Sequence, residues 1–203
     1  MIGKNIIEIE ETDSTNLYTS ILLKSKKIPE GTVISAFRQN SGRGQGNNLW
    51  ESEAGKNLTV SIVLYPYFLP IEEQSMLNKV ISLGIYDMMT ALTKGKANIK
   101  IKWPNDIYIS DKKVSGILIE NAIIGNKFIH SIVGVGIHIN QEIFRGGAPN
   151  PVSLKNVTGK EHELKECLEL LCSCLDNRYS QLKNENYKTI DEDYLSTSYN
   201  VPS

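Results

Sequence analysis

The sequence predicts an α+β domain in which a mixed or antiparallel sheet is backed by helices. Short segments in which apolar and polar residues alternate, the pattern of a half-buried strand, recur along the chain. Two longer segments, residues 71–94 and 164–182, instead repeat apolar residues at the spacing of one helix face. The 203 residues suffice for one sizeable domain, which we place at residues 1–183, with residues 184–203 as a polar tail.

The composition narrows the functional class. Lys and Arg number 22 against 23 acidic residues, so a broad nucleic-acid surface is not expected. No apolar run approaches the roughly 18 residues that span a bilayer, and acids stand where a signal peptide needs an apolar core, so we expect a cytoplasmic protein. Cys167, Cys172 and Cys174 cluster in one helical segment, which predicts buried, reduced thiols.

Near the N-terminus, a strand over residues 6–10 precedes the polar segment DSTN, residues 13–16. These residues begin a helix predicted over residues 14–26, with Leu17 and Ile21 on its apolar face. Helix capping alone explains the polar side chains as well as a ligand does. A helix N-terminus also presents free N–H groups, which suit a polar or anionic ligand.

A strand predicted over residues 32–38 leads into a long polar connection, RQNSGRGQGNN, at residues 38–48. Its glycines allow the backbone to approach a ligand and to hinge, and Arg43 can pair with phosphate or carboxylate. A flexible surface loop explains the glycines equally well. Trp50 at the far end favours a lid that is anchored there.

Residues 57–65 form the clearest predicted strand, with four apolar side chains on one face. The helix over residues 71–94 begins with two acids, which the helix dipole favours, and Gly95 ends it. We expect this helix to cover the sheet without chemistry of its own.

Residues 99–120, IKIKWPNDIYISDKKVSGILIE, read as three short strand pieces. They hold a Trp, an Asn–Asp corner and a lysine pair beside Gly116 on rigid elements. We expect Lys112 to face solvent. Residue pattern alone would make Lys113 a solvated turn lysine as well.

A Gly–Asn turn then leads to a strand over residues 128–139. Gly134 and Gly136 lie inside it, where glycine weakens a sheet, so close approach of a ligand or another backbone is expected. His130 and His138 are more often satisfied sheet residues than catalysts. Together with the glycine-rich loop and the KWPND segment, this strand predicts one polar pocket with Lys and Arg, suited to an anionic substrate.

These segments, in this order, resemble the catalytic domain of biotin–protein ligases, the biotin–[acetyl-CoA-carboxylase] ligases. The matching motifs are DSTN at residues 13–16, QNSGRG at 39–44, Trp50, KWPND at 102–106, KKVSGIL at 112–118 and GVGIHIN at 134–140. Each is weak alone, but KWPND followed by KVSGILIE, with GRG upstream, is highly specific.

The resemblance implies an enzyme that joins biotin to ATP, giving biotinyl-5′-AMP and pyrophosphate. It would then transfer biotin to one lysine of a carrier, the biotin carboxyl carrier protein. Mg²⁺ is expected from ATP chemistry, with Asp106 either a ligand or a turn cap. Nucleic acid and membrane are not expected partners, and a homodimer is compatible with the resemblance. The alternatives are a lipoate or octanoate protein ligase and a non-catalytic ligand-binding homologue.

The resemblance also implies roles for individual residues. Lys113 matches the family's central lysine, between the biotin carboxylate and the α-phosphate, and Arg43 is its expected catalytic companion. The residues expected to bind biotin are Ser14, Thr15, Asn16, Gln39, Arg43, Gly44, Gln45, Lys113 and Gly116. Those expected to bind ATP or the adenylate are Arg43, Trp50, Asn105, His138 and Asn140. No metal ligands are assigned.

The chain departs from the family pattern at several points. The family loop commonly reads GRGRxGRxW, whereas this chain has GRGQGNNLW, so Gln45 and Asn48 replace arginines and Arg43 carries more of the charge. His138 stands where an asparagine is usual. Family members often carry a small C-terminal β-barrel, of which residues 184–203 would be the start. No helix-turn-helix precedes Met1, so repressor activity is not expected.

Overall fold

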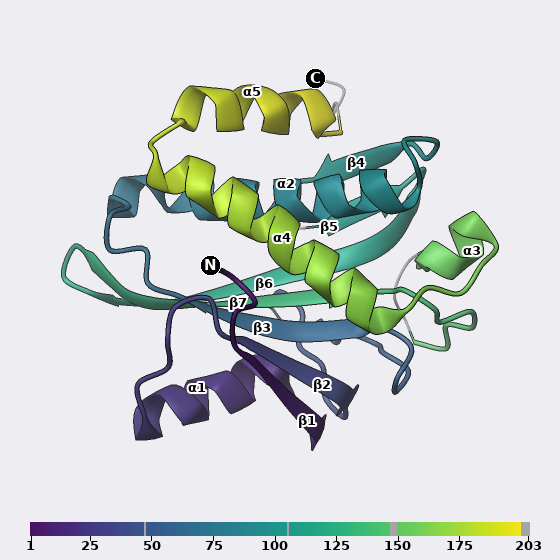
Figure 1. The fold of residues 1–203 in the computed structure, drawn as a ribbon, viewed down its shortest axis with the longest axis horizontal. Coiled ribbons are helices and arrows are strands. Elements are labelled where there is room, and N and C mark those ends of the chain that lie inside the picture. The colour runs from purple at the N-terminus through teal and green to yellow at the C-terminus, as the bar shows by residue number, and fades with distance from the viewer. Residues whose placement is uncertain (47, 105, 147–149, 200–203) are drawn as a thin grey trace.

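A computed structural model of the chain describes residues 1–46, 48–104, 106–146 and 150–199. A seven-stranded sheet with the order β1-β2-β3-β7-β6-β5-β4 runs through it (Figure 1). Its strands are β1 (Ile6–Thr12), β2 (Val33–Gln39), β3 (Leu58–Leu64), β4 (Ile99–Lys102), β5 (Asp106–Ile109), β6 (Lys112–Ile124) and β7 (Lys127–Ile137). β1 and β2 are parallel and the other neighbours antiparallel, which confirms the expected mixed sheet.

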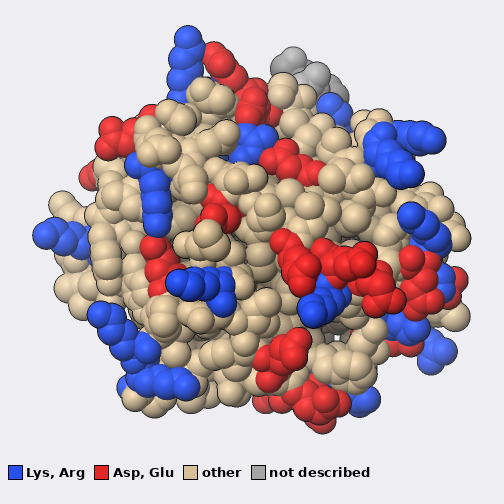
Figure 2. All heavy atoms as spheres, viewed as in Figure 1, with Lys and Arg blue, Asp and Glu red and all other residues tan. Residues whose placement is uncertain are grey.

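Helices cover both faces of this sheet. The helices are α1 (Thr15–Ser25), α2 (Gln74–Leu92), α3 (Leu154–Thr158), α4 (Leu164–Lys183) and α5 (Tyr187–Thr197), with a 3-10 turn at Ile71–Glu73. Helices α2, α4 and α5 lie on one side and α1 on the other (Figure 1). Within the described residues, every helix is too short or too polar to cross a bilayer. Acidic and basic side chains are interspersed on the face shown in Figure 2.

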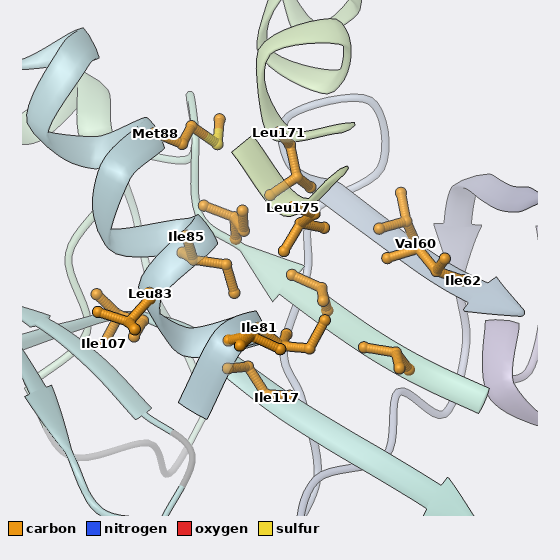
Figure 3. Close-up of a cluster of buried hydrophobic side chains, with 14 of the residues drawn as sticks. Val60, Ile62, Ile81, Leu83, Ile85, Met88, Ile107, Ile117, Leu171 and Leu175 are labelled. Atoms are coloured by element: carbon orange, nitrogen blue, oxygen red, sulfur yellow. The ribbon is translucent and has the colours of Figure 1, made fainter. Parts of the chain in front are cut away.

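The larger core lies between the sheet and the pair α2 and α4. Ile81 and Ile85 of α2 and Leu175 of α4 point toward the sheet, where they meet Val60 and Ile117 (Figure 3). Burying each such side chain contributes about 1.5–3 kcal/mol. This layer fixes β3, β6 and β7 as a rigid base, and the opposite face of these strands carries the site.

The two helices α2 and α4 cross at Gly84. A Cβ built there would lie 2.7 Å from Leu175 Cδ2 and 3.1 Å from Leu175 Cα. We expect Gly84→Ala to lower the free energy of unfolding by about 1–3 kcal/mol, because overpacking outweighs the better helix propensity of alanine. Urea denaturation measures this change. In a Leu175→Ala background the substitution should cost less, and an equal cost in both backgrounds would contradict the steric explanation.

Helix α1 is rotated relative to the sequence-based expectation. Leu17 and Ile21 are 42% and 59% exposed, so their assignment to the apolar face was wrong. The buried residues are Thr15, Asn16 and Thr19, while Tyr18 and Leu22 pack against a small core of Ile28, Ile34 and Val63. The polar start of the helix faces inward, toward the sheet. This orientation determines which residues of the following turns are buried.

Strand β3 is buried on both faces, because α1 covers the side that faces away from α2 and α4. At the C-terminal end, α5 packs against α2 and β4, with Ile190 and Tyr194 buried. Arg178 of α4 links these helices through Asp87 of α2 (2.7 Å) and Asp193 of α5 (2.5 Å). These two carboxylates raise the pKa of the Arg178 guanidinium.

Candidate active site

A small cavity lies on the α1 side of the sheet, where α1 begins and β5, β6 and β7 pass beneath the glycine-rich loop. Ten of the predicted site residues line it: Ser14, Thr15, Asn16, Gln39, Arg43, Gly44, Gln45, Trp50, Lys113 and Gly116. The cavity measures about 50 Å³. This is well below the roughly 300–1,000 Å³ of typical ligand pockets, so a ligand of biotin's size needs side chains to move aside.

The start of α1 forms a polar cluster at one end of the cavity. The Thr15 backbone N–H donates to Gln39 Oε1 at 2.8 Å. Ser61, fully buried on β3, bonds to the Thr15 hydroxyl (2.8 Å) and donates to Asn16 Oδ1 (2.6 Å). Sequence reasoning missed Ser61, although a serine inside the apolar strand LTVSIVL was a usable signal. The cluster offers donors and acceptors fixed by their mutual bonds.

The Asn16 side chain is fixed by contacts with three strands, β3, β6 and β7. Its Nδ2 donates to Leu118 O (3.2 Å) and to Glu120 Oε2 (2.8 Å) on β6. A Cβ at Gly134 would come within 2.5 Å of Asn16 Oδ1. The expected close approach at this strand glycine is therefore made by a side chain of α1.

Lys113 defines the cationic end of the cavity. Its Nζ lies 2.8 Å from Asp106 Oδ1 and 5.7 Å from the centre of the Trp50 ring. Its backbone is fixed as well, since the Lys113 N–H donates to Asn150 O (2.8 Å) and its C=O accepts from Val152 N (2.9 Å). Lys112 is exposed, as expected. Lys113 is thus a rigidly mounted cation.

Trp50 fills the remaining space beside Lys113. Its indole lies over Gly136, where a Cβ would collide with it, and 3.2 Å from a Cβ built at Gly116. The ring stacks on His138 with centroids 4.4 Å apart and planes at 9°. Phe144 meets the His138 ring edge-on at 4.8 Å. The glycines of β6 and β7 thus provide a flat slot that an aromatic ring occupies.

Burial lowers the pKa of His138 from 6.5 to about 3, with a smaller contribution from Lys113, so the imidazole is neutral at pH 7. As the pH falls, His138 takes up a proton in the unfolded state, near its ordinary pKa of 6.5, before it does so in the folded state. The free energy of unfolding therefore decreases as the pH drops below 6.5. Between pH 6.5 and 5 we expect the wild type to lose about 2 kcal/mol more unfolding free energy than His138→Asn. Urea titrations at both pH values test this. Equal losses would show that His138 is not buried in this way.

Two predicted adenylate residues, Asn140 and His138, are not among the residues that line the cavity. Asn140 does not line the cavity: its Nδ2 donates to His162 O (2.7 Å) and its Oδ1 accepts from His162 N (2.9 Å). These two bonds tether the segment before α4, and adenylate binding by Asn140 stays a prediction. Asn105 lies outside the described residues. His138 reaches the cavity only through Trp50.

Glu51 is a second residue that sequence reasoning missed. Its carboxylate accepts the backbone N–H groups of Arg145 (2.8 Å) and Gly146 (2.6 Å). It thereby ties the end of the glycine-rich loop to the segment after β7. A lone glutamate next to a tryptophan gave no signal for this role.

A metal site is not evident in the described part of the chain, which contains no group of three or more His, Cys, Asp or Glu side chains placed to hold an ion. Asp106 is the acidic side chain that lines the cavity, and it is paired with Lys113.

Comparison with known proteins gives a consistent picture. A family model described as the Biotin/lipoate A/B protein ligase family matches residues 8–138. The bifunctional ligase/repressor BirA of Bacillus spizizenii is 27% identical over 195 residues, which cover 94% of this chain and 58% of that protein. The biotin–[acetyl-CoA-carboxylase] ligase of Paracoccus denitrificans is 29% identical, with 93% of this chain and 78% of that protein covered.

Among solved structures, biotin protein ligase from Aquifex aeolicus in complex with biotin and ATP matches with a TM-score of 0.82 and 30% identity. The match covers 96% of this chain and 78% of that one. The chain spans less than two thirds of the length of the Bacillus relative. Because the family model matches well over half of the residues, the chain belongs to the biotin/lipoate A/B protein ligase family.

Proposed function

We propose that the chain is an ATP-dependent biotin–protein ligase. It joins biotin to ATP to give biotinyl-5′-AMP and pyrophosphate, and then transfers the biotinyl group to a lysine of a biotin carboxyl carrier protein. The observation that carries the proposal is that the DSTN cluster and Lys113 line the same cavity. The known relatives that are biotin ligases support it.

The polar cluster of Ser14, Thr15, Asn16 and Gln39 binds the ureido ring. A ureido group has two N–H donors and one carbonyl acceptor, and the cluster offers hydroxyls and amides of both kinds. A site that hydrogen-bonds such a group rejects analogues without it, because its own polar groups would be left unpaired. The cluster therefore selects the ring, whereas lipoate and octanoate have no ureido group.

Lys113 stabilises the reacting groups. The biotin carboxylate attacks the α-phosphate of ATP, so two anions must approach and negative charge builds up as the new bond forms. A fixed cation that is already in place lowers that barrier without reorganising. Arg43 of the glycine-rich loop supplies a second positive charge, and Asp106 keeps the lysine ammonium in position.

When the Trp50 indole moves out of the slot over Gly116 and Gly136, the adenine takes its place and packs between the indole and His138. A neutral imidazole suits this role, because it adds no charge beside the base. Gln45 lines the cavity at a position where the family loop pattern GRGRxGRxW has an arginine. Lys113 and Arg43 therefore carry most of the positive charge near the phosphates. We expect Mg²⁺ to enter with the phosphates of ATP.

The decisive experiment is biotin-dependent exchange of labelled pyrophosphate into ATP, with lipoate and octanoate as parallel substrates. Exchange with biotin alone supports the first half-reaction, and transfer to a carrier then tests the second. Exchange with lipoate or octanoate instead would make the chain a lipoyl-type ligase. Absence of exchange with all three acids, from folded protein, would favour a non-catalytic ligand-binding homologue, consistent with Gln45 and Asn48 in the loop.

A further inference from the structure

Glu120, near the middle of β6, joins two parts of the site that belong to different segments of the chain. Its Oε2 accepts from Asn16 Nδ2 at 2.8 Å, and its Oε1 lies 3.2 Å from Arg43 Nη2. One carboxylate thus connects the polar start of α1 with the arginine of the glycine-rich loop. Glu120 and Arg43 are partly exposed, at 37% and 48% of their side chains.

Building on the biotin ligase function proposed above, we propose that Glu120 is a positioning residue with two separate tasks. One oxygen fixes the Asn16 amide so that its own oxygen faces Ser61 and the ligand side. The other holds Arg43 until an anionic ligand replaces the glutamate as its partner.

The first task follows from the bonds of Asn16. Its amide has two N–H donors, and both are used, by Leu118 O and by Glu120. Its oxygen accepts from Ser61 and keeps a second lone pair. A flipped amide would direct N–H groups at Ser61 and turn its oxygen toward a carboxylate. Glu120 therefore makes the observed orientation the favourable one.

The second task follows from charge. Arg43 is the arginine that lines the cavity, and its guanidinium is paired with Glu120 rather than with a group at the Lys113 end. An incoming carboxylate or phosphate competes with Glu120 for it. Since an exposed ion pair is weak, the exchange of partners is easy and reversible.

Two substitutions separate the tasks. Glu120→Gln keeps an oxygen that can accept from Asn16 but removes the negative charge that holds Arg43. Glu120→Ala removes both. Asp191→Asn is the matched control, because it removes a carboxylate that pairs with Lys79 in the helical layer, away from the cavity.

The hold of Glu120 on Arg43 is tested without ligand, by measuring the rate of tryptic cleavage after Arg43. We expect Glu120→Gln and Glu120→Ala to be cleaved about two- to fivefold faster than the wild type, the effect of losing an exposed ion pair, and Asp191→Asn to match the wild type. Wild-type rates in both Glu120 variants would overturn the hold on Arg43.

The role of Glu120 in orienting the Asn16 amide is tested by measuring binding affinities calorimetrically, with biotin and with its neutral amide, biotinamide. Glu120→Ala should bind biotinamide about tenfold more weakly, whereas Glu120→Gln should bind it like the wild type and bind biotin more tightly. Equal biotinamide affinities in the two variants would overturn the role in orienting Asn16. If the wild type binds neither ligand, the biotin ligase function fails, while the cleavage experiment still decides the Arg43 pairing.

Discussion

Replacing Lys113 with alanine is expected to lower the rate of biotin-dependent pyrophosphate exchange by about 10²–10³, because a preorganised donor of this kind contributes that much to a transition state that gains negative charge. The loss should appear in kcat as well as in kcat/KM, since the charge that Lys113 meets is greatest in the transition state. The fold should persist, because a partly exposed ion pair such as Lys113–Asp106 contributes at most about 1 kcal/mol.

The neighbouring lysine provides the control for this experiment. Lys112 has the same charge and lies one position earlier on the same strand, but it is exposed. Lys112→Ala should leave the exchange rate within about twofold of the wild type, as surface substitutions away from a site usually do. A large loss in Lys112→Ala, or near-normal exchange in Lys113→Ala, would remove Lys113 from its proposed role.

Much of the site was accessible to sequence reasoning because its segments are locally patterned. Lys113 and Gly116 belong to a strand that alternation predicts, and the DSTN segment sits at the start of a recognisable helix. Gly134 and Gly136 stood out because glycine is unfavourable inside a strand. In each case a short-range rule marked the residue, and the sheet then brought the marked residues together.

The residues that were missed depend on contacts between distant segments. Glu120 meets Asn16 across 104 positions, and Glu51 meets Gly146 across 95. No local pattern encodes such pairs. The buried face of α1 was predicted wrongly for a related reason. Leu17 and Ile21 have helical spacing, but the buried contacts of Asn16 determine which face of the helix turns inward. The bonds of the Asn140 amide to the backbone of His162, 22 positions away, are likewise not encoded by a local pattern.

Trp50 is expected to leave its present position when ligand binds, because the cavity of about 50 Å³ cannot hold biotin and a nucleotide while the indole fills the slot over Gly136. Its Nε1 is buried and has no hydrogen-bond partner among the described residues. A buried, unpaired donor costs about 1–3 kcal/mol, which favours any rearrangement that satisfies it. The indole is therefore a replaceable occupant of the slot.

In Trp50→Ala we expect the KM for ATP to rise about tenfold or more, since stacking of a base on an aromatic side chain contributes about 1–3 kcal/mol. The KM for biotin should change little, because the ureido cluster lies at the other end of the cavity. Leu49→Ala is the control on the same loop, since Leu49 is 78% exposed. Equal effects of the two substitutions would contradict a specific role for the indole.

Fluorescence can follow the movement directly. The chain has two tryptophans, and Trp103 is 78% exposed, so a Trp103→Phe protein leaves Trp50 as the only indole reporter. Addition of biotin and ATP should then change the Trp50 emission, because the ring exchanges its contact with His138 for a new one. An unchanged spectrum in protein that catalyses exchange would mean that ligand enters without moving Trp50, and that the space must come from the Arg43 side of the loop instead.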